Sequence, residues 1–110
     1  MTIEQIDKVD GMGFDAANGE VVLIISDHLD WKDHNRHFAV LEQKLGSYID
    51  FVQSGQLKDT MSQSVGKSTR IKLVHQHTPP VEAKLILDSI SQQLSEMDLA
   101  FSYESLPSTY

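Results

Sequence analysis

The stretch 24–37 concentrates most of the side chains that could do chemistry. It contains Asp27, Asp30 and Asp33, three of the five histidines, and Trp31, the only tryptophan. Histidine changes its charge near neutral pH, carries protons and is a common metal ligand. Imidazoles and carboxylates at this density are therefore typical of a metal site, an acid–base site or a recognition patch.

A metal site would take its ligands from this stretch. His28, Asp30, His34 and His37 are suitable ligand types, and the last two are three residues apart on a predicted helix. That spacing does not match the HExxH pattern, in which the histidines are four residues apart. The chain has no cysteine, so thiolate ligands are excluded. We expect no cofactor, with a divalent metal ion as the alternative.

An acid–base enzyme would pair a carboxylate with an imidazole. Asp27 with His28, or Asp30 with His75, would form such a pair, because histidine titrates near neutrality. The sequence has no nucleophile elbow and no glycine-rich phosphate loop beside them. The first interpretation is therefore a non-enzymatic binding or regulatory module, and a small metal-dependent or acid–base enzyme is the alternative.

A recognition patch would combine Trp31, as an aromatic anchor, with acids that orient a basic partner. A tryptophan at the start of a helix is also typical of a lid over the edge of a core. Of the net charge of −7, residues 1–33 hold −6, with eight acids and two lysines. This balance argues against a nucleic-acid partner, since phosphate binding needs clustered Lys and Arg. It suits a basic protein partner, as in an acidic immunity or inhibitor protein.

The rest of the chain predicts the elements that position these residues. Asn18-Gly19 predicts a two-residue hairpin turn that places Phe14 opposite Leu23. A first helix is expected after Asp30, as its N-cap, and ends at Ser54-Gly55. A polar loop, 56–68, leads to a strand over 69–77, a second helix opened by Pro79-Pro80, and a last strand over 99–103. The apolar stripes expected to face the core are Phe38, Leu41, Leu45, Tyr48, Ile49 and Val52 in the first helix and Ala83, Ile86, Leu87, Ile90, Leu94 and Met97 in the second.

This order of elements, β-β-α-β-α-β, predicts one α+β domain over residues 1–110, with 106–110 as a frayed tail. We expect a two-layer sandwich: a mixed four-stranded sheet with two helices on one face. Parallel strands would bring all five histidines to the carboxyl end of the sheet, where open sheets of this kind bind ligands. The candidate ligand- or partner-binding residues are Asp27, His28, Asp30, Trp31, His34, His37, His75 and His77.

The face of the sheet away from the helices is expected to be partly apolar. Val22, Ile24 and Val74 would lie there among polar residues. Because an open apolar face indicates an interface, we predict a homodimer built on these three residues. The longest apolar run, 21–25, is far too short to span a membrane, and the first residues lack signal-peptide features. We expect a cytoplasmic protein that does not bind membranes.

The segment Ile25-Ser26-Asp27-His28-Leu29-Asp30-Trp31 and the helix after it resemble a family of small bacterial proteins of unknown function that carry an ISDHLDW segment. The helix contributes Leu41, Leu45, Tyr48, Phe51 and Ser54-Gly55 to this resemblance. The resemblance covers nearly the whole chain. It implies a stand-alone bacterial cytoplasmic domain, and it implies no activity, cofactor or catalytic residue.

Overall fold

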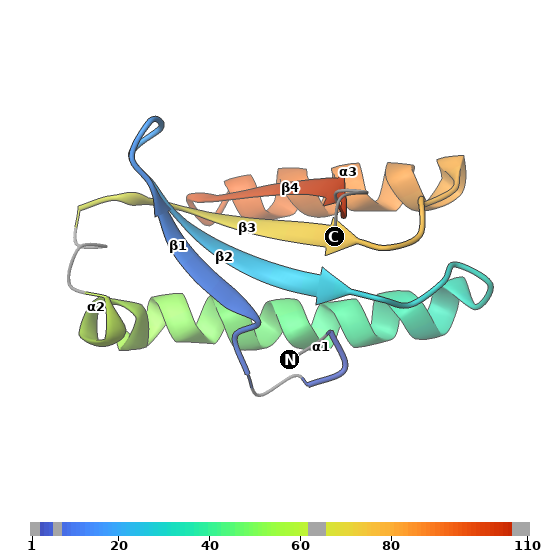
Figure 1. Ribbon diagram of the computed structural model, residues 1–110, viewed down its shortest axis with the longest axis horizontal. Coiled ribbons are helices and arrows are strands. Elements are labelled where there is room, and N and C mark those ends of the chain that lie inside the picture. Colours follow the sequence, from blue (N-terminus) through green and yellow to red (C-terminus); the bar gives the residue numbers. More distant parts are fainter. Residues whose placement is uncertain (1–2, 6–7, 62–65, 107–110) are drawn as a thin grey trace.

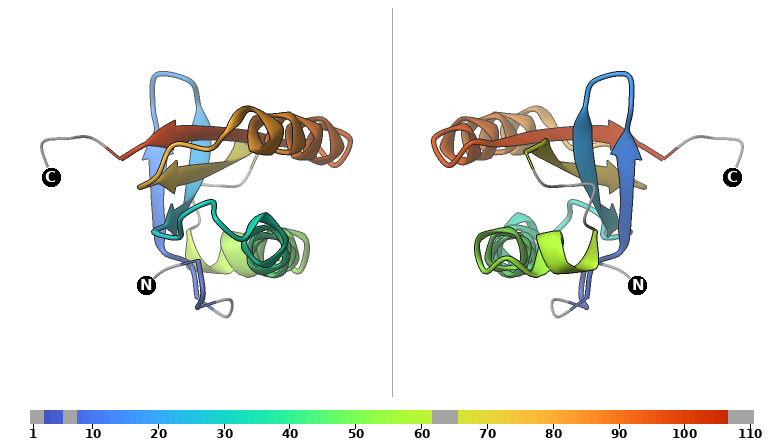
Figure 2. Two further views of the ribbon diagram at one scale, coloured as in Figure 1. Left: turned by 90° about the vertical axis from the view of Figure 1, so that its right-hand side faces the viewer. Right: turned by 90° about the vertical axis from the view of Figure 1, so that its left-hand side faces the viewer.

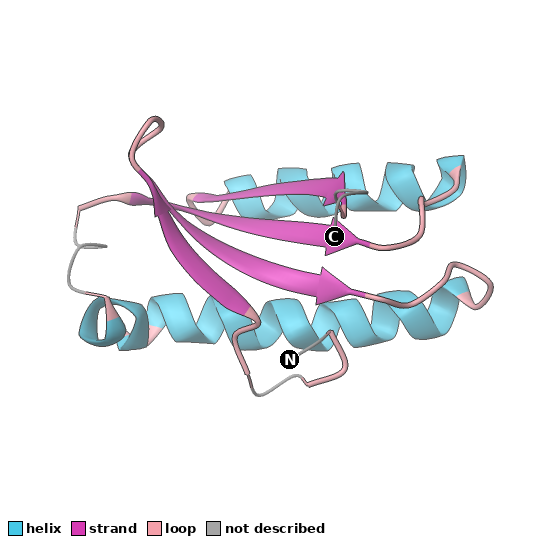
Figure 3. Cartoon of the chain, in the orientation of Figure 1, coloured by secondary structure: helices cyan, strands magenta, loops and turns pink. Residues whose placement is uncertain are grey.

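Four strands and three helices make up the protein in a computed structural model that describes residues 3–5, 8–61 and 66–106. In chain order the elements are β1 (Gly11–Asp15), β2 (Glu20–Asp27), α1 (His34–Gln53), α2 (Gln56–Thr60), β3 (Ser68–His75), α3 (Val81–Ser95) and β4 (Leu99–Ser105) (Figures 1 and 3). The predicted order β-β-α-β-α-β is confirmed, with α2 as a five-residue helix inside the expected loop. Most of the expected frayed tail, 107–110, lies outside the described residues.

The strands lie side by side in chain order, β1-β2-β3-β4. β1 pairs antiparallel with β2, whereas β2–β3 and β3–β4 are parallel. Both β-α-β crossovers therefore advance in the same direction, and right-handed crossovers then place their helices on the same face. Figure 2 shows α1 and α3 on one side of the sheet, and no described element covers the other side. The predicted α+β fold with a mixed sheet is confirmed.

The core lies between the sheet and these helices. Val21, Leu23 and Ile25 of β2 are fully buried, and Ile71 and Leu73 of β3 lie beside them in register. Their alternation follows from the period of two along a strand, which sends every second side chain to the helix side. Burying one such side chain contributes about 1.5–3 kcal/mol. This layer fixes where the carboxyl ends of β2 and β3 lie.

The β1–β2 register differs by two residues from the expected one. Asp15 pairs with Glu20, so Met12 rather than Phe14 lies opposite Leu23. A shift of two residues leaves each side chain on its predicted face, because the period of a strand is two. The assignment of the open face is therefore unaffected.

The hairpin loop, 16–19, has four residues instead of two, and the Asp15 carboxylate explains why. Asp15 Oδ1 accepts hydrogen bonds from the amides of Ala17 and Asn18, and Oδ2 accepts one from the Asn18 side chain. Gly19 is the loop residue with a positive φ, at 66°. A two-residue type I′ turn would need positive φ at both Asn18 and Gly19.

Helix α1 begins at His34, with Asp33 rather than the expected Asp30 as its N-cap. Asp33 Oδ1 accepts from the Arg36 amide at 3.1 Å. Asp30 instead accepts from the Lys32 amide in the preceding turn. Both aspartates have the chemistry of a cap, and only the path of the loop decides between them.

The far end of α1 confirms the predicted stop, since Gly55 follows the helix with a φ of 91°. The stripe predicted for α1 faces the core throughout. The stripe predicted for the second helix is wrong at Ile86 of α3, which is 44% exposed, and at Met97, which is 41% exposed and lies beyond the end of α3 at Ser95. Ile86 lies at the edge of the stripe, where the helix meets solvent.

Candidate functional site

The carboxyl ends of β2 and β3 bring the predicted histidine and aspartate residues together. Asp27 and His75 end these two strands and are partners in register. His37 comes from the first turn of α1. His77 lies beyond the end of β3, which stops two residues earlier than expected, and its side chain is exposed.

A buried pair, His37 and Asp27, is the centre of this region. His37 Nε2 lies 2.5 Å from Asp27 Oδ2, and the two side chains are 1% and 0% exposed. His37 Nδ1 lies 2.9 Å from the carbonyl oxygen of Asp30. The expected pairing of Asp27 with His28 does not form, because His28 contacts Glu4 instead. The strand end, the loop and the helix are therefore joined by one imidazole ring.

Both nitrogens of His37 face oxygen atoms, which determines what this pair can do. The Asp30 carbonyl accepts only, so Nδ1 must carry a hydrogen and donate it. Another proton must lie between Nε2 and Asp27 Oδ2, because two lone pairs would repel at 2.5 Å. A general base needs a lone pair that a substrate can reach. The His37–Asp27 pair offers none, and it instead ties the β2–α1 loop to the helix.

Trp31 covers this pair. Its indole stacks on the His37 ring at 3.7 Å between centroids, and its Nε1 donates to the carbonyl of His77 at 3.0 Å. His34 meets the same indole edge-on. Trp31 is only 7% exposed, so it acts as the lid over the core edge and presents little surface to a partner. It also joins the β2–α1 loop to the β3–α3 loop.

His75 is buried at the end of β3, beside Asp27 in the sheet. The side chain is 4% exposed, and its Nδ1 has no hydrogen-bond partner in the described part of the chain. The expected Asp30–His75 pair is thus not formed at this nitrogen. Burial lowers the pKa of His75, and the negative charge of Asp27 partly opposes this. His75 is therefore held as a neutral ring at neutral pH.

A pocket of ≈ 230 Å³ opens outside these buried groups, between the β2–α1 loop and the β3–α3 loop. It is lined by His28, Leu29, Asp30, Asp33, Arg36, His37 and His77. Four of the eight predicted site residues therefore share one pocket. No group of three or more His, Asp or Glu among the described residues is arranged to hold a metal ion.

A second buried network, around Lys44, was missed by the sequence interpretation. Lys44 Nζ donates to the carbonyls of Gln5 and Lys8, both at 2.6 Å, and to Asp10 Oδ1 at 2.8 Å. The Lys44 and Asp10 side chains are both 0% exposed. The sequence did contain an indication of this network, because Lys44 is three residues from Leu41 and therefore lies on the buried stripe of α1.

Tyr48 and Asp10 extend this network to β2. The Tyr48 hydroxyl donates to the carbonyl of Ile24 at 2.6 Å and accepts from the Asp10 amide at 2.8 Å. Asp10 Oδ2 accepts from the Ser26 amide. Burial raises the pKa of Tyr48, so its hydroxyl keeps the proton it donates. The segment before β1 is thereby attached to both α1 and β2.

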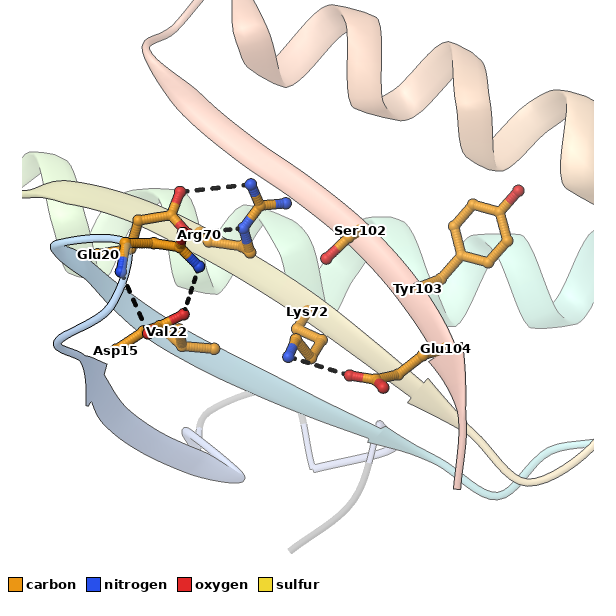
Figure 4. Close-up of a pocket in the computed structure, with 9 residues that line it drawn as sticks. Asp15, Glu20, Val22, Arg70, Lys72, Ser102, Tyr103 and Glu104 are labelled. Carbon is orange, nitrogen blue, oxygen red and sulfur yellow. Dashed lines mark hydrogen bonds and ion pairs between the residues drawn. The ribbon is translucent and has the colours of Figure 1, made fainter. Parts of the chain in front are cut away.

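The open face of the sheet holds a larger groove of ≈ 530 Å³, drawn in Figure 4. Its lining residues are Asp15, Asn18, Glu20, Val22, Arg70, Lys72, Ser102, Tyr103 and Glu104. Arg70 contacts Glu20 through two nitrogens, at 3.0 and 3.3 Å, and Lys72 contacts Glu104 at 3.0 Å. The charges on this face therefore pair across neighbouring strands.

Two further groups complete the groove. The Asn18 side chain lowers the pKa of Asp15 by donating a hydrogen bond to its carboxylate, so Asp15 adds a negative charge at the rim. Tyr103 directs its ring away from the groove toward α3 (Figure 4), where its hydroxyl donates to Asp88. The predicted interface residues Val22, Ile24 and Val74 lie half-buried on this face.

These features define a small α+β domain with a half-covered sheet, a pocket at its carboxyl end and a groove on its open face. The chain belongs to DUF6572, a family of unknown function whose model matches residues 1–107. The expected membership in a family without an assigned activity is thus confirmed. No curated protein and no solved structure matches the chain. None of the helices in the described residues is both long enough and apolar enough to cross a bilayer.

Proposed function

We propose that this protein is a non-enzymatic binding module that acts as a homodimer through the open face of its sheet. The observation that carries this proposal is the uncovered face itself. Val22, Ile24 and Val74 remain half-buried there, because no described helix packs on them. An open face with apolar side chains around a groove is typical of an interface.

The charges on this face favour a second copy as the partner. The bases Arg70 and Lys72 lie on β3, inside the sheet, whereas the acids Glu20 and Glu104 lie on the strands to either side. A twofold rotation can place the bases of one copy near the acids of the other, which is the self-complementarity that a symmetric dimer needs. The buried His37–Asp27 pair supports the non-enzymatic part of the proposal.

Light scattering coupled to size-exclusion chromatography tests this function. We expect a mass twice that of the 12.4 kDa chain at micromolar concentrations. Val22→Lys and Val74→Lys should each shift the mass to that of the monomer, because a buried ammonium without a partner disrupts an apolar contact. The matched control is Val81→Lys on α3, which makes the same substitution at a valine that lies outside the open face and is 70% exposed.

Two outcomes would contradict the proposal. One is a monomeric mass for the unaltered chain at every concentration. The other is a dimer that persists in Val22→Lys and Val74→Lys but dissociates in Val81→Lys, which would place the interface on α3. Circular dichroism of each variant separates loss of association from loss of folding.

A further inference from the structure

At the pocket formed by the carboxyl ends of β2 and β3, two lining residues, His28 and Arg36, contact the carboxylate of Glu4. His28 Nε2 contacts Glu4 Oε1 at 3.0 Å, and Arg36 Nη2 contacts Glu4 Oε2 at 3.1 Å. Both oxygens of one carboxylate are therefore recognised by two different side chains. We propose that this pocket is a binding site for a carboxylate group from outside the chain, and that Glu4 is its built-in competitor.

The donors of the pocket fit this chemistry. Arg36 presents a planar guanidinium, which matches the geometry of a carboxylate and stays charged at all relevant pH values. His28 and His77 add imidazole nitrogens to the same lining, and both side chains are exposed. These three groups come from the β2–α1 loop, the first turn of α1 and the β3–α3 loop, so they surround a ligand from different elements.

The two acids in the lining do not oppose an anion as strongly as their charges imply. One oxygen of Asp30 accepts from the Lys32 amide, and one oxygen of Asp33 accepts from the Arg36 amide. Asp30 is therefore engaged by a backbone N–H group of the turn before α1, and Asp33 by one in the first turn of α1, whose dipole partly offsets its charge. Arg36 and the two histidines remain as the side-chain donors of the pocket.

The loops that carry the donors are held in place without a ligand. Trp31 joins the two loops through the carbonyl of His77, and the buried His37 fixes the β2–α1 loop from below. A site whose walls are already positioned loses less entropy when it binds. The conformational entropy of these loops is therefore lost when the chain folds and not when a ligand binds.

Glu4 can leave the site through its side chain alone. The preceding residue, Ile3, is fully buried and its amide donates to the carbonyl of Ser26, so the backbone stays attached. The Glu4 side chain is 43% exposed, and its partners His28 and Arg36 are 44% and 56% exposed. Ion pairs at such exposure are weak, so an external carboxylate can replace Glu4.

Titration by ¹⁵N–¹H NMR at low ionic strength tests this inference on the full chain. The probes are acetate and a capped peptide, Gly-Gly-Glu-Gly-Gly, and the control ligand is the same peptide with Gln in place of Glu. We expect Glu4→Ala to bind both carboxylate probes about fivefold more tightly than the unaltered chain, because an exposed ion pair no longer competes. Glu42→Ala, which removes an exposed acid elsewhere on α1, should leave the affinity unchanged.

The donor variants supply the second half of the test. Arg36→Gln and His28→Gln, each combined with Glu4→Ala, should abolish the saturable shifts around the pocket, whereas Lys58→Gln on α2 should not. The inference is overturned by shifts that do not saturate in Glu4→Ala, by equal shifts from the Gln peptide, or by full binding without Arg36. Binding of the peptide alone identifies an acidic peptide as the ligand, and equal binding of acetate identifies a free carboxylate.

This test does not depend on the proposed homodimer. The pocket lies at the ends of β2 and β3, whereas Val22 and Val74 lie on the open face. A monomeric chain that binds carboxylates would contradict the homodimer and support the pocket. A dimer that binds no carboxylate would support the homodimer and contradict the carboxylate site.

Discussion

Helix α1 contributes to two buried pairs, at positions seven residues apart, and each pair satisfies a buried carboxylate in a different way. His37 pairs with Asp27, and Lys44 pairs with Asp10. Residues seven apart lie near the same side of a helix, so both side chains enter the core from one stripe. Lys44 Nζ donates to the carbonyls of Gln5 and Lys8 and to Asp10 Oδ1, at 2.6 to 2.8 Å. The His37 ring has two nitrogens and two acceptors.

The difference lies in how each pair can respond to loss of its partner. Loss of the His37 ring removes one partner from the Asp27 carboxylate and one from the Asp30 carbonyl. Asp10 faces a full ammonium charge, and removing that charge also leaves the carbonyls of Gln5 and Lys8 without this donor. The buried lysine therefore stabilises more of its surroundings than the buried histidine does.

Replacing Lys44 with methionine should give the largest effect. Lys44→Met keeps the volume of the side chain but leaves Asp10 as a buried charge without its cation. We expect the free energy of unfolding in urea to fall by about 4 kcal/mol, as is usual when one partner of a buried ion pair is removed. Lys58→Met, at an exposed position of α2, is the control and should change stability little. A loss as small as that of the control would mean that Lys44 is not essential to the core.

Replacing His37 with phenylalanine should cost somewhat less. His37→Phe preserves a ring for Trp31 to stack on but leaves the buried Asp27 carboxylate without its imidazole partner. We expect a loss of about 3 kcal/mol in the same urea measurement. Adding Asp27→Asn should recover part of this loss, because an amide carries no charge to bury. If the double variant is less stable than His37→Phe, the two side chains do not act as a pair.

Removing the Tyr48 hydroxyl tests the link between the Lys44 network and β2. Tyr48→Phe leaves the Asp10 amide and the Ile24 carbonyl without their shared partner. Unsatisfied buried groups of this kind cost about 1–3 kcal/mol each, and we expect a net loss of about 2 kcal/mol in urea denaturation. Tyr103→Phe, which removes a more exposed hydrogen bond to Asp88, should cost below about 1 kcal/mol. Equal losses would show that burial does not distinguish the two hydroxyls.

The smallest expected effect is a dependence of stability on pH that arises from His75. Because burial lowers its pKa in the folded chain, the unfolded chain binds the proton first as the pH falls below about 6.5. Stability should therefore decrease from about pH 7.5 to about pH 5.5. His75→Phe should make urea midpoints less dependent on pH over this range, whereas His77→Phe, at an exposed position, should not. An unchanged slope in His75→Phe would exclude this histidine as its source.

Local periodicity explains why much of the fold was predictable. The strand and helix stripes, the stop at Gly55 and the gathering of histidines at one end of the sheet all follow from spacing along the chain. Asp33 was harder to predict as the N-cap, since Asp30 has the same chemistry three residues earlier. The partner of Asp27 depends on that choice, because the first turn of α1 brings His37 to it.

The Lys44 network was not predictable from the same rules. Gln5, Lys8 and Asp10 precede β1 in a segment without apolar periodicity, so nothing local places them over α1. The carbonyls of Gln5 and Lys8 are backbone acceptors, and a backbone carbonyl is present at every residue, so it leaves no signal in the sequence. A charged residue within an apolar stripe indicates that a partner exists but does not identify it.

The sequential order of the strands also has a kinetic consequence. The β1–β2 hairpin closes over a loop of four residues and can form within microseconds. The parallel β2–β3 pairing places Val21 beside Thr69, and α1 and α2 lie between these two strands in the sequence. Long loops of this kind slow folding, because their entropy is lost before the contacts form. During synthesis, β1 and β2 are made before β3, so the β2–β3 pairing has to wait for the C-terminal half of the chain.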